Sequence, residues 1–456
     1  MDYHKKARYI VGMFLLLASL ASHAWSLDNL VEEMVLQDNW VEVSRLLEND
    51  STYLHDPVAR ILMGHACIHL NNTNCNRFRL KIDGDYTIWL DWTNSFGSRF
   101  PEKAVAMHLR GDAHMRIGDY DNAIADLTKA IQLDKDYYPA FNSRGGVFMA
   151  IDSLDKAIAD FSKAIKINKR FAAPYSSRAQ CYRTLGKYKR ALKDYAKAMK
   201  LRPDDADLYY NRGYVYDVME EYDKAVAEYT KAIGLSPADA DYYFNRGNSF
   251  IELGELDNAI ADFTSSLEID PLHCGALTNR AGMYLAQDMF SEAITDYTSA
   301  IEAVPNDLAT YTNRANAYRV MGMYDSAIAD CNLALSLDST DAESYYHRGI
   351  ARRAQDASTD FVDDFTTAIR LNPEYDQALL SRGLAYEKTG DFQKAILDYT
   401  KAIEANPDYA IAYDARGRLY MLEMGDKEKA CKDWKQACQL GRCTNYIIAK
   451  EKGDCN

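Results

Sequence analysis

An arginine recurs ten times at intervals of 34 residues, and this spacing constrains the fold more than any other feature of the chain. It stands at positions 110, 144, 178, 212, 246, 280, 314, 348, 382 and 416, and Gly or Ala follows it each time. Most of these segments carry Ala thirteen residues after the Arg and an acidic residue three positions further on, and many end in Pro. A fixed period of this length is typical of stacked structural repeats.

Each 34-residue segment predicts two helices joined by a short turn. In residues 206–219 the apolar side chains recur every three or four positions, and the pattern resumes over residues 222–235. Small residues at fixed positions let the two helices approach closely, and a large residue beside the acidic one supplies the contact from the second helix. One such pair cannot bury its apolar face alone, so consecutive pairs are expected to stack.

Two segments depart from the pattern. Phe361 stands where the segment 342–375 would carry its small Ala, and the last segment has one extra residue before Ala430. We expect the first departure to bend or loosen the stack and the second to mark a C-terminal cap.

On these residues the chain resembles the tetratricopeptide repeat family over residues 104–443. The resemblance implies an all-α fold, a right-handed α-solenoid of about ten helix–turn–helix repeats, whose first helices line a concave peptide-binding groove. Residues 25–103 lack the repeat pattern and are predicted to form a mostly helical N-terminal cap, with a strand or irregular segment at 78–92. Residues 444–456 are predicted to be a C-terminal tail.

Asn precedes the repeated Arg in four consecutive repeats, although Asn is less favourable than Ala inside a helix. The resemblance places this position in the groove, where an amide can pair with the N–H and C=O of an extended peptide. The alternative is that these amides bond to the adjacent repeat. The predicted peptide-binding residues are Asn211, Asn245, Asn279, Asn313, Tyr210, Tyr214, Phe244, Asn248 and Asn316.

The repeated Arg and acidic residues predict a structural ladder of ion pairs that holds neighbouring hairpins in register. The alternative is a basic stripe that binds acidic side chains of a peptide. The predicted ladder includes Arg212, Arg246, Arg280, Arg314, Glu228, Asp262 and Asp296.

One repeat is basic, although the chain as a whole has a net charge of −14. This basic patch is interpreted either as a solvated helix surface or as a site for an acidic segment, a lipid headgroup or an anionic polymer. Its residues are Arg183, Lys187, Lys189, Arg190 and Lys193.

The first 24 residues have the pattern of a secretory signal peptide. Lys5, Lys6 and Arg8 precede a short apolar run, and a small-x-small cleavage site follows at 22–24. We therefore expect an exported protein, periplasmic or secreted, without an integral membrane segment after cleavage. The alternative is that the segment stays as an uncleaved anchor.

An oxidising compartment permits disulfide bonds. We expect one between Cys67 and Cys75, which are close in sequence, and one or two among the four cysteines near the C-terminus.

The negative charge excludes a generally basic nucleic-acid-binding protein. The chain has no Gly-rich phosphate loop and no nucleophile elbow, so no catalytic residue and no cofactor are predicted. No metal site is predicted either, because His65 and His69 lack a third firm ligand.

The sequence thus predicts a non-catalytic scaffold that binds a protein or peptide partner. The alternatives are an envelope assembly or chaperone-like factor that holds exported proteins, and an enzyme or metal-binding protein with a site in the N-terminal cap.

Overall fold

The computed structural model describes residues 34–35, 86–355 and 360–455, and this part of the chain is all-α. The predicted signal peptide and most of the predicted N-terminal cap lie outside the described residues. Helix α5 (Tyr86–Arg99) covers the end of the segment expected to be a strand or irregular, so that expectation is wrong for residues 86–92. Thr93 and Phe96, three residues apart on one face of α5, are fully buried, which accounts for a helix there.

Internal contacts divide the chain into two units, residues 1–238 and 239–456. In its described part, unit 1 contains α5, α6 (Ala104–Arg116), α7 (Tyr120–Leu133), α8 (Tyr138–Ala150), α9 (Leu154–Ile167), α10 (Ala173–Thr184), α11 (Tyr188–Leu201), α12 (Ala206–Val218) and α13 (Tyr222–Leu235).

The described part of unit 2 contains α14 (Ala240–Glu252), α15 (Leu256–Ile269), α16 (Cys274–Ala286), α17 (Phe290–Ala303), α18 (Leu308–Val320), α19 (Tyr324–Leu337), α20 (Ala342–Ala354), α21 (Asp360–Leu371), α22 (Asp376–Lys388), α23 (Phe392–Ala405), α24 (Ala410–Leu422), α25 (Lys427–Gln439) and α26 (Thr444–Glu451).

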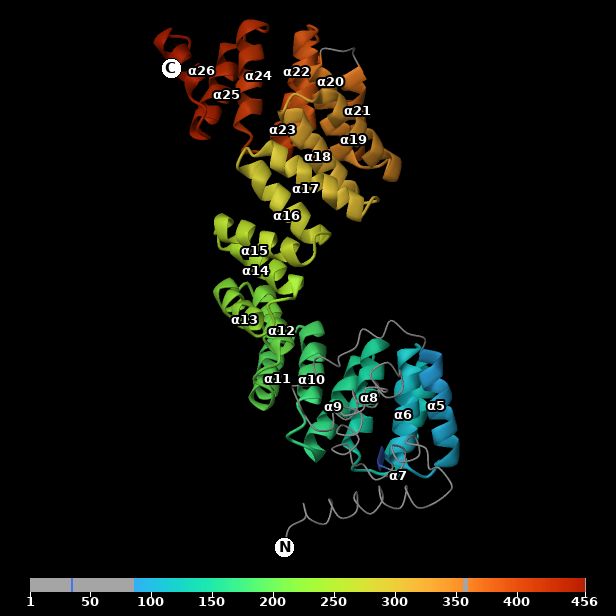
Figure 1. Ribbon diagram of the computed structural model, residues 1–456. Coiled ribbons are helices and arrows are strands. Elements are labelled where there is room, and N and C mark those ends of the chain that lie inside the picture. The colour runs from blue at the N-terminus through green and yellow to red at the C-terminus, as the bar shows by residue number, and fades with distance from the viewer. Residues whose placement is uncertain (1–33, 36–85, 356–359, 456) are drawn as a thin grey trace, which may run out of the picture. The chain divides into compact units, whose positions relative to one another are not determined.

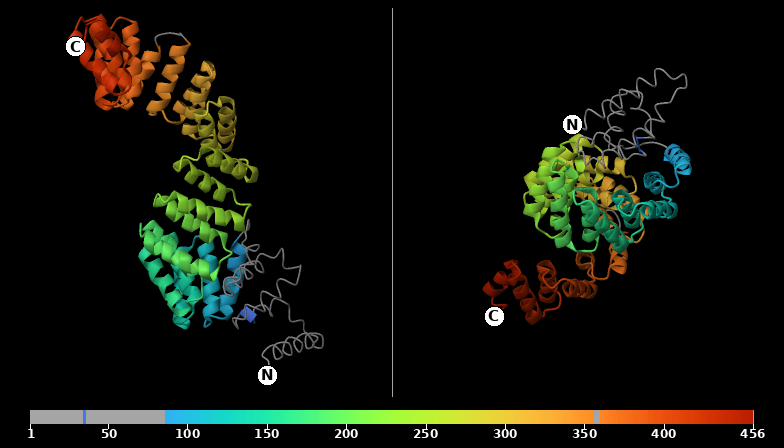
Figure 2. Two further views of the ribbon diagram at one scale, coloured as in Figure 1. Left: turned by 90° about the vertical axis from the view of Figure 1, so that its left-hand side faces the viewer. Right: turned by 90° about the horizontal axis from the view of Figure 1, so that it is seen from below.

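From α6 to α25 the helices are paired as consecutive hairpins (Figure 1). Within each unit the second helix of a hairpin also packs against the first helix of the next. First helices of successive hairpins touch as well: α6 contacts α8, and α8 contacts α10, whereas in unit 2 α18 contacts both α16 and α20. The hairpins of each unit follow one another in chain order (Figure 2), which is the arrangement of a helical solenoid.

A small residue on the first helix lets each hairpin close tightly. A Cβ atom built on Gly213 would lie 2.9 Å from Cε1 of Tyr229, and one built on Gly383 would lie 2.5 Å from Cε1 of Tyr399. Both tyrosine rings are fully buried. At Gly213 and Gly383, glycine therefore permits a close approach between the helices, where an added methyl group would strain the core.

In the hairpins whose turns lie within the described residues, the turn contains a residue with positive φ. Asp152, Glu220 and Asp288 adopt this left-handed conformation at φ 57–59°. The same position is glycine in the hairpins before, between and after these three, at 118, 186, 254, 322 and 390. The turn therefore alternates with a period of two repeats, and non-glycine residues there are strained.

Two cysteines inside the stack are packed as small apolar groups. Burial raises the pKa of the Cys181 thiol to about 11 and that of Cys331 to about 12. Both are fully buried, so neither thiol is poised to react.

The C-terminal end is cross-linked by two disulfide bonds. Cys431 of α25 is bonded to Cys455, beyond α26, and Cys438 is bonded to Cys443. The segment predicted as a tail therefore contains a helix, α26, that is held against the last hairpin. In the described part of the chain, none of the helices has the length and apolarity needed to cross a bilayer.

We expect Glu220→Gly to raise the free energy of unfolding by about 0.5–1 kcal/mol, because relief of the left-handed strain exceeds the added backbone entropy of glycine. The reverse change, Gly186→Glu at the same position of the preceding hairpin, should lower it by about 1 kcal/mol. Urea denaturation measures both. If the Glu220→Gly variant is less stable than the natural chain, the left-handed conformation of Glu220 does not strain the protein.

Candidate interaction surface

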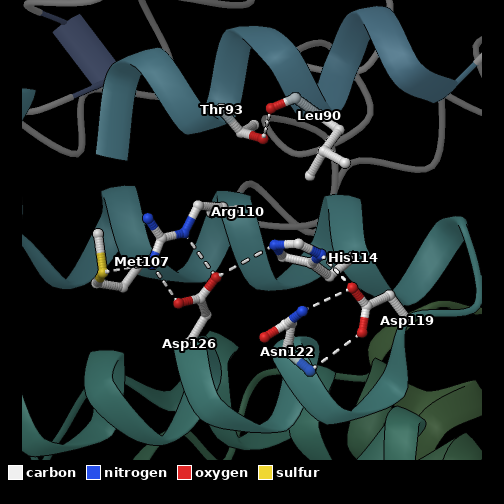
Figure 3. Close-up of polar contacts among 8 residues, drawn as sticks. All are labelled: Leu90, Thr93, Met107, Arg110, His114, Asp119, Asn122 and Asp126. Atoms are coloured by element: carbon white, nitrogen blue, oxygen red, sulfur yellow. Dashed lines mark hydrogen bonds and ion pairs between the residues drawn. The ribbon is translucent and has the colours of Figure 1, made fainter. Parts of the chain in front are cut away.

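In each hairpin, a carboxylate of the second helix binds an arginine of the first. Arg110 Nε donates to Asp126 Oδ2 at 2.7 Å, and Arg110 Nη2 donates to Asp126 Oδ1 at 2.5 Å (Figure 3). Two parallel bonds between a guanidinium and a carboxylate give the strongest geometry for such a pair. Figure 3 also shows Asp119, which caps the start of α7 by accepting from the backbone N–H of Asn122.

The same two-bond fork recurs in both units. In the last hairpin the acidic residue comes one position late, yet Arg416 still donates twice to Asp433, at 2.8 Å each, so the fork survives the insertion. The other forks are Arg144–Asp160, Arg178–Asp194, Arg246–Asp262, Arg280–Asp296, Arg314–Asp330, Arg348–Asp364 and Arg382–Asp398.

These ion pairs lie within single hairpins, so the predicted role of the carboxylates in joining neighbouring hairpins needs correction. The third guanidinium nitrogen makes that connection. Arg280 Nη1 donates to Thr264 Oγ1 of the preceding hairpin at 3.0 Å, and Arg314 Nη1 donates to Thr298 Oγ1 at 3.0 Å. The corresponding acceptors elsewhere are Thr128, Ser162, Asn332, Thr366 and Thr400.

In most hairpins the guanidinium group of the repeated arginine is therefore already hydrogen-bonded to side chains of the protein. For Arg280, the hydrogen bond to Asp296 raises the pKa, against the opposing effect of burial. The charged form is thus stabilised in place, with three nitrogen atoms engaged by Asp296 and Thr264. The sequence analysis missed these hydroxyl acceptors, although they too recur at the 34-residue period.

The hairpin of α12 and α13 is an exception, because its acidic residue is glutamate. Arg212 Nη2 donates to Glu228 Oε1 at 2.5 Å, but Arg212 Nε and Glu228 Oε2 are buried without a hydrogen-bond partner. The extra methylene of glutamate displaces the carboxylate from the fork geometry.

In unit 1, the predicted peptide-binding residues lie on α12. Asn211 Nδ2 donates to Asp207 O of its own helix at 2.7 Å. The Tyr210 ring lies 5.7 Å from the buried Tyr229 ring, between centroids. Tyr214 is 38% exposed, and the guanidinium of Arg183 lies over its ring at 4.6 Å from the centroid. Tyr214 is therefore the most accessible aromatic of this group.

In unit 2, the predicted amides lie on α14, α16 and α18. Asn245 Nδ2 donates to Asp241 O, one turn back in its own helix, at 2.9 Å. Asn279 Nδ2 donates to Asn248 Oδ1 at 2.7 Å, which is the bond between adjacent repeats that the alternative interpretation predicts. Asn313 is exposed.

Two further predicted residues of unit 2 have internal partners. Asn316 Oδ1 accepts from Arg319 Nη2 at 2.7 Å. The Phe244 ring packs 4.7 Å from the His273 ring, and a Cβ atom on Gly275 would lie 2.8 Å from it. The predicted groove residues thus differ in how strongly the scaffold holds them.

The predicted basic patch comes from two helices. Lys187, Lys189, Arg190 and Lys193 are exposed at the start of α11, and none makes an ion pair with a described residue. Arg183, on the first helix α10, is half-buried and stacks on Tyr214 instead. The structure therefore brings four of the five residues together.

The remaining predicted positions cannot be placed. Cys67 and Cys75, and also His65 and His69, lie outside the described residues. Among the residues that are described, no group of three or more His, Cys, Asp or Glu side chains could hold a metal ion.

Profiles of the tetratricopeptide repeat family match six stretches of the chain: residues 104–137, 179–217, 219–254, 240–272, 309–341 and 377–409. Together with the hairpin stack, these matches decide the family. The chain is a tetratricopeptide repeat protein with multiple repeats. Repeats of this family generally serve as protein-interaction scaffolds and are typically non-catalytic.

Solved structures of such repeats resemble this tetratricopeptide repeat protein. A crystal structure of MamA is 30% identical, covering 37% of this chain and 96% of that one, with a TM-score of 0.32. The C-terminal part of a TPR repeat-containing protein from Cytophaga hutchinsonii is 17% identical, with coverages of 52% and 97% and a TM-score of 0.44. YrrB, described as a TPR protein with an unusual peptide-binding site, is 22% identical, with coverages of 49% and 97% and a TM-score of 0.31. No curated protein matches the chain.

We expect Glu228→Asp to raise the free energy of unfolding by about 1 kcal/mol, because it restores the fork and satisfies two buried polar atoms. The matched reverse change, Asp262→Glu, should lower it by a similar amount. Chemical denaturation measures both. Equal stabilities of the two variants and the natural chain would show that the fork geometry contributes nothing.

Proposed function

We propose that this protein is a non-catalytic scaffold that binds an extended segment of a partner polypeptide along its first helices. The observation that carries this proposal is the set of side-chain amides on consecutive first helices of unit 2. Asn245 on α14 and Asn313 on α18 are the amides proposed to bind, whereas Asn248 and Asn279 are bonded to each other across two first helices, as the alternative interpretation predicts.

The chemistry of these residues suits the backbone of a peptide. An amide side chain offers both a donor and an acceptor, which is what the N–H and C=O of an extended chain require. In unit 1, a separate candidate contact is the exposed ring of Tyr214, on which Arg183 stacks. Because the repeated arginines are already bound by the protein's own carboxylates, these departures from the repeat pattern are the better candidates for binding.

We also propose that the protein works outside the cytoplasm. The signal-like segment at residues 1–24 supports this proposal, and so do the two disulfide bonds at the C-terminal end, because such bonds persist in oxidising compartments. Fractionation of the producing cells tests it, and recovery of the protein in the cytoplasm with its signal intact would contradict it.

We expect Asn245→Ala/Asn313→Ala to weaken peptide binding about thirtyfold, because each of the two amides supplies a hydrogen bond worth about 1 kcal/mol. The probes are peptides selected for binding to the natural protein from a library of unstructured sequences, and fluorescence anisotropy gives the Kd.

Asn258→Ala is the matched control, since Asn258 is an exposed asparagine on the second helix α15. Its Kd should stay within about twofold of the natural value. An unchanged Kd in the Asn245→Ala/Asn313→Ala variant would show that these two amides do not contact the peptide.

A further inference from the structure

Two arginines on neighbouring first helices of unit 2 lie outside the repeated forks. Arg319 lies near the end of α18 and Arg353 near the end of α20, and both are half-buried. Neither makes an ion pair with a described residue. By contrast, Arg348 and Arg352 both bind Asp364, at 2.7 and 2.8 Å.

The two arginines occupy equivalent positions, 34 residues apart, on α18 and α20, which contact each other. Thr312 and Ser344 share a buried hydrogen bond of 3.0 Å between these helices. Thr312 and Arg319 are seven residues apart and so lie on the same face of α18. The same spacing places Tyr346 and Arg353 on one face of α20.

Tyr346 lies within the field of both guanidinium groups. Burial raises the pKa of its hydroxyl, whereas a hydrogen bond with Ser381 and the positive charges of Arg319 and Arg353 lower it. The tyrosine ring is fixed by contacts with Tyr375 and Phe365, at centroid distances of 5.0 and 6.1 Å. A rigid aromatic group thus stands beside the two charges.

One neighbouring polar group, the side-chain amide of Asn316, orients Arg319 without adding a charge. Asn316 Oδ1, a neutral acceptor, receives bonds from Arg319 Nη2 at 2.7 Å and Nε at 3.3 Å. Glu387 of α22 is already bound by Arg418, at 2.8 Å, and by the Tyr399 hydroxyl, at 2.7 Å. Asp376 accepts from the neutral amide of Asn406 at 2.7 Å, so it keeps its negative charge, which raises the Tyr346 pKa where the two arginines lower it.

We propose that Arg319 and Arg353 bind carboxylate side chains of an extended partner segment, in which acidic and apolar residues alternate. This inference rests on the proposed function and names the chemistry of the partner. Half-buried guanidinium groups that form no ion pair with the described residues are costly, and a carboxylate of the partner would offset that cost. Ile350, midway between Tyr346 and Arg353 on the same face of α20, offers apolar contact beside the charges.

The test compares two fluorescein-labelled peptides, Ser-Leu-Glu-Leu-Glu-Leu-Glu-Ser and its analogue with Gln in place of Glu. The natural protein should bind the Glu peptide about tenfold more tightly, although its net charge of −14 opposes this preference. The preference should disappear in Arg319→Gln/Arg353→Gln and largely return in Arg319→Lys/Arg353→Lys.

The matched control is Arg170→Gln/Arg370→Gln, which removes two exposed arginines without ion pairs to described residues and changes the net charge equally. This variant should keep the preference. Retention of the preference in Arg319→Gln/Arg353→Gln, or an equal loss in the control, would overturn the inference. Equal binding of both peptides by the natural protein, or binding of neither, would overturn it. The proposed function fails separately, if no peptide of the library binds the natural protein.

Discussion

The two-bond fork between a first-helix arginine and a second-helix carboxylate is the interaction on which the stack depends. It fixes the two helices of one hairpin, and the remaining guanidinium nitrogen reaches a side-chain oxygen of the preceding hairpin. One residue therefore joins three helices. A buried arginine would be costly alone, but here its charge and its donors are satisfied by partners that recur with the same period.

This arrangement separates what holds the scaffold from what varies along it. Residues that recur along the repeats contact other residues of the scaffold, as Gly213 contacts Tyr229 and Arg280 binds Asp296. Residues that appear in only a few repeats, such as Asn313 and Arg319, make few internal bonds. Specificity in a repeat protein must reside in such departures, because a feature present in all repeats cannot single out one position along the stack.

Periodicity predicted the hairpins, the arginine and carboxylate partners and the small residue opposite a large one, because each of these depends on local spacing. Periodicity did not predict that the Arg–carboxylate ion pairs form within single hairpins. The acidic residue recurs every 34 positions, so the spacing alone does not show whether an arginine binds the one 16 residues ahead or the one in a neighbouring repeat. The helix at 86–92 was missed because it lies outside the repeats. The bond between Asn279 and Asn248 depends on the exact stagger of two first helices, which no sequence spacing specifies.

Amide hydrogen exchange in the Arg314→Ala variant tests the central claim most directly. Arg314 forks Asp330 of its own hairpin and donates to Thr298 of α17 in the preceding one. If one arginine joins three helices, exchange should accelerate in α17 as well as in α18 and α19. Acceleration confined to α18 and α19, with α17 exchanging as in the natural protein, would contradict the claim.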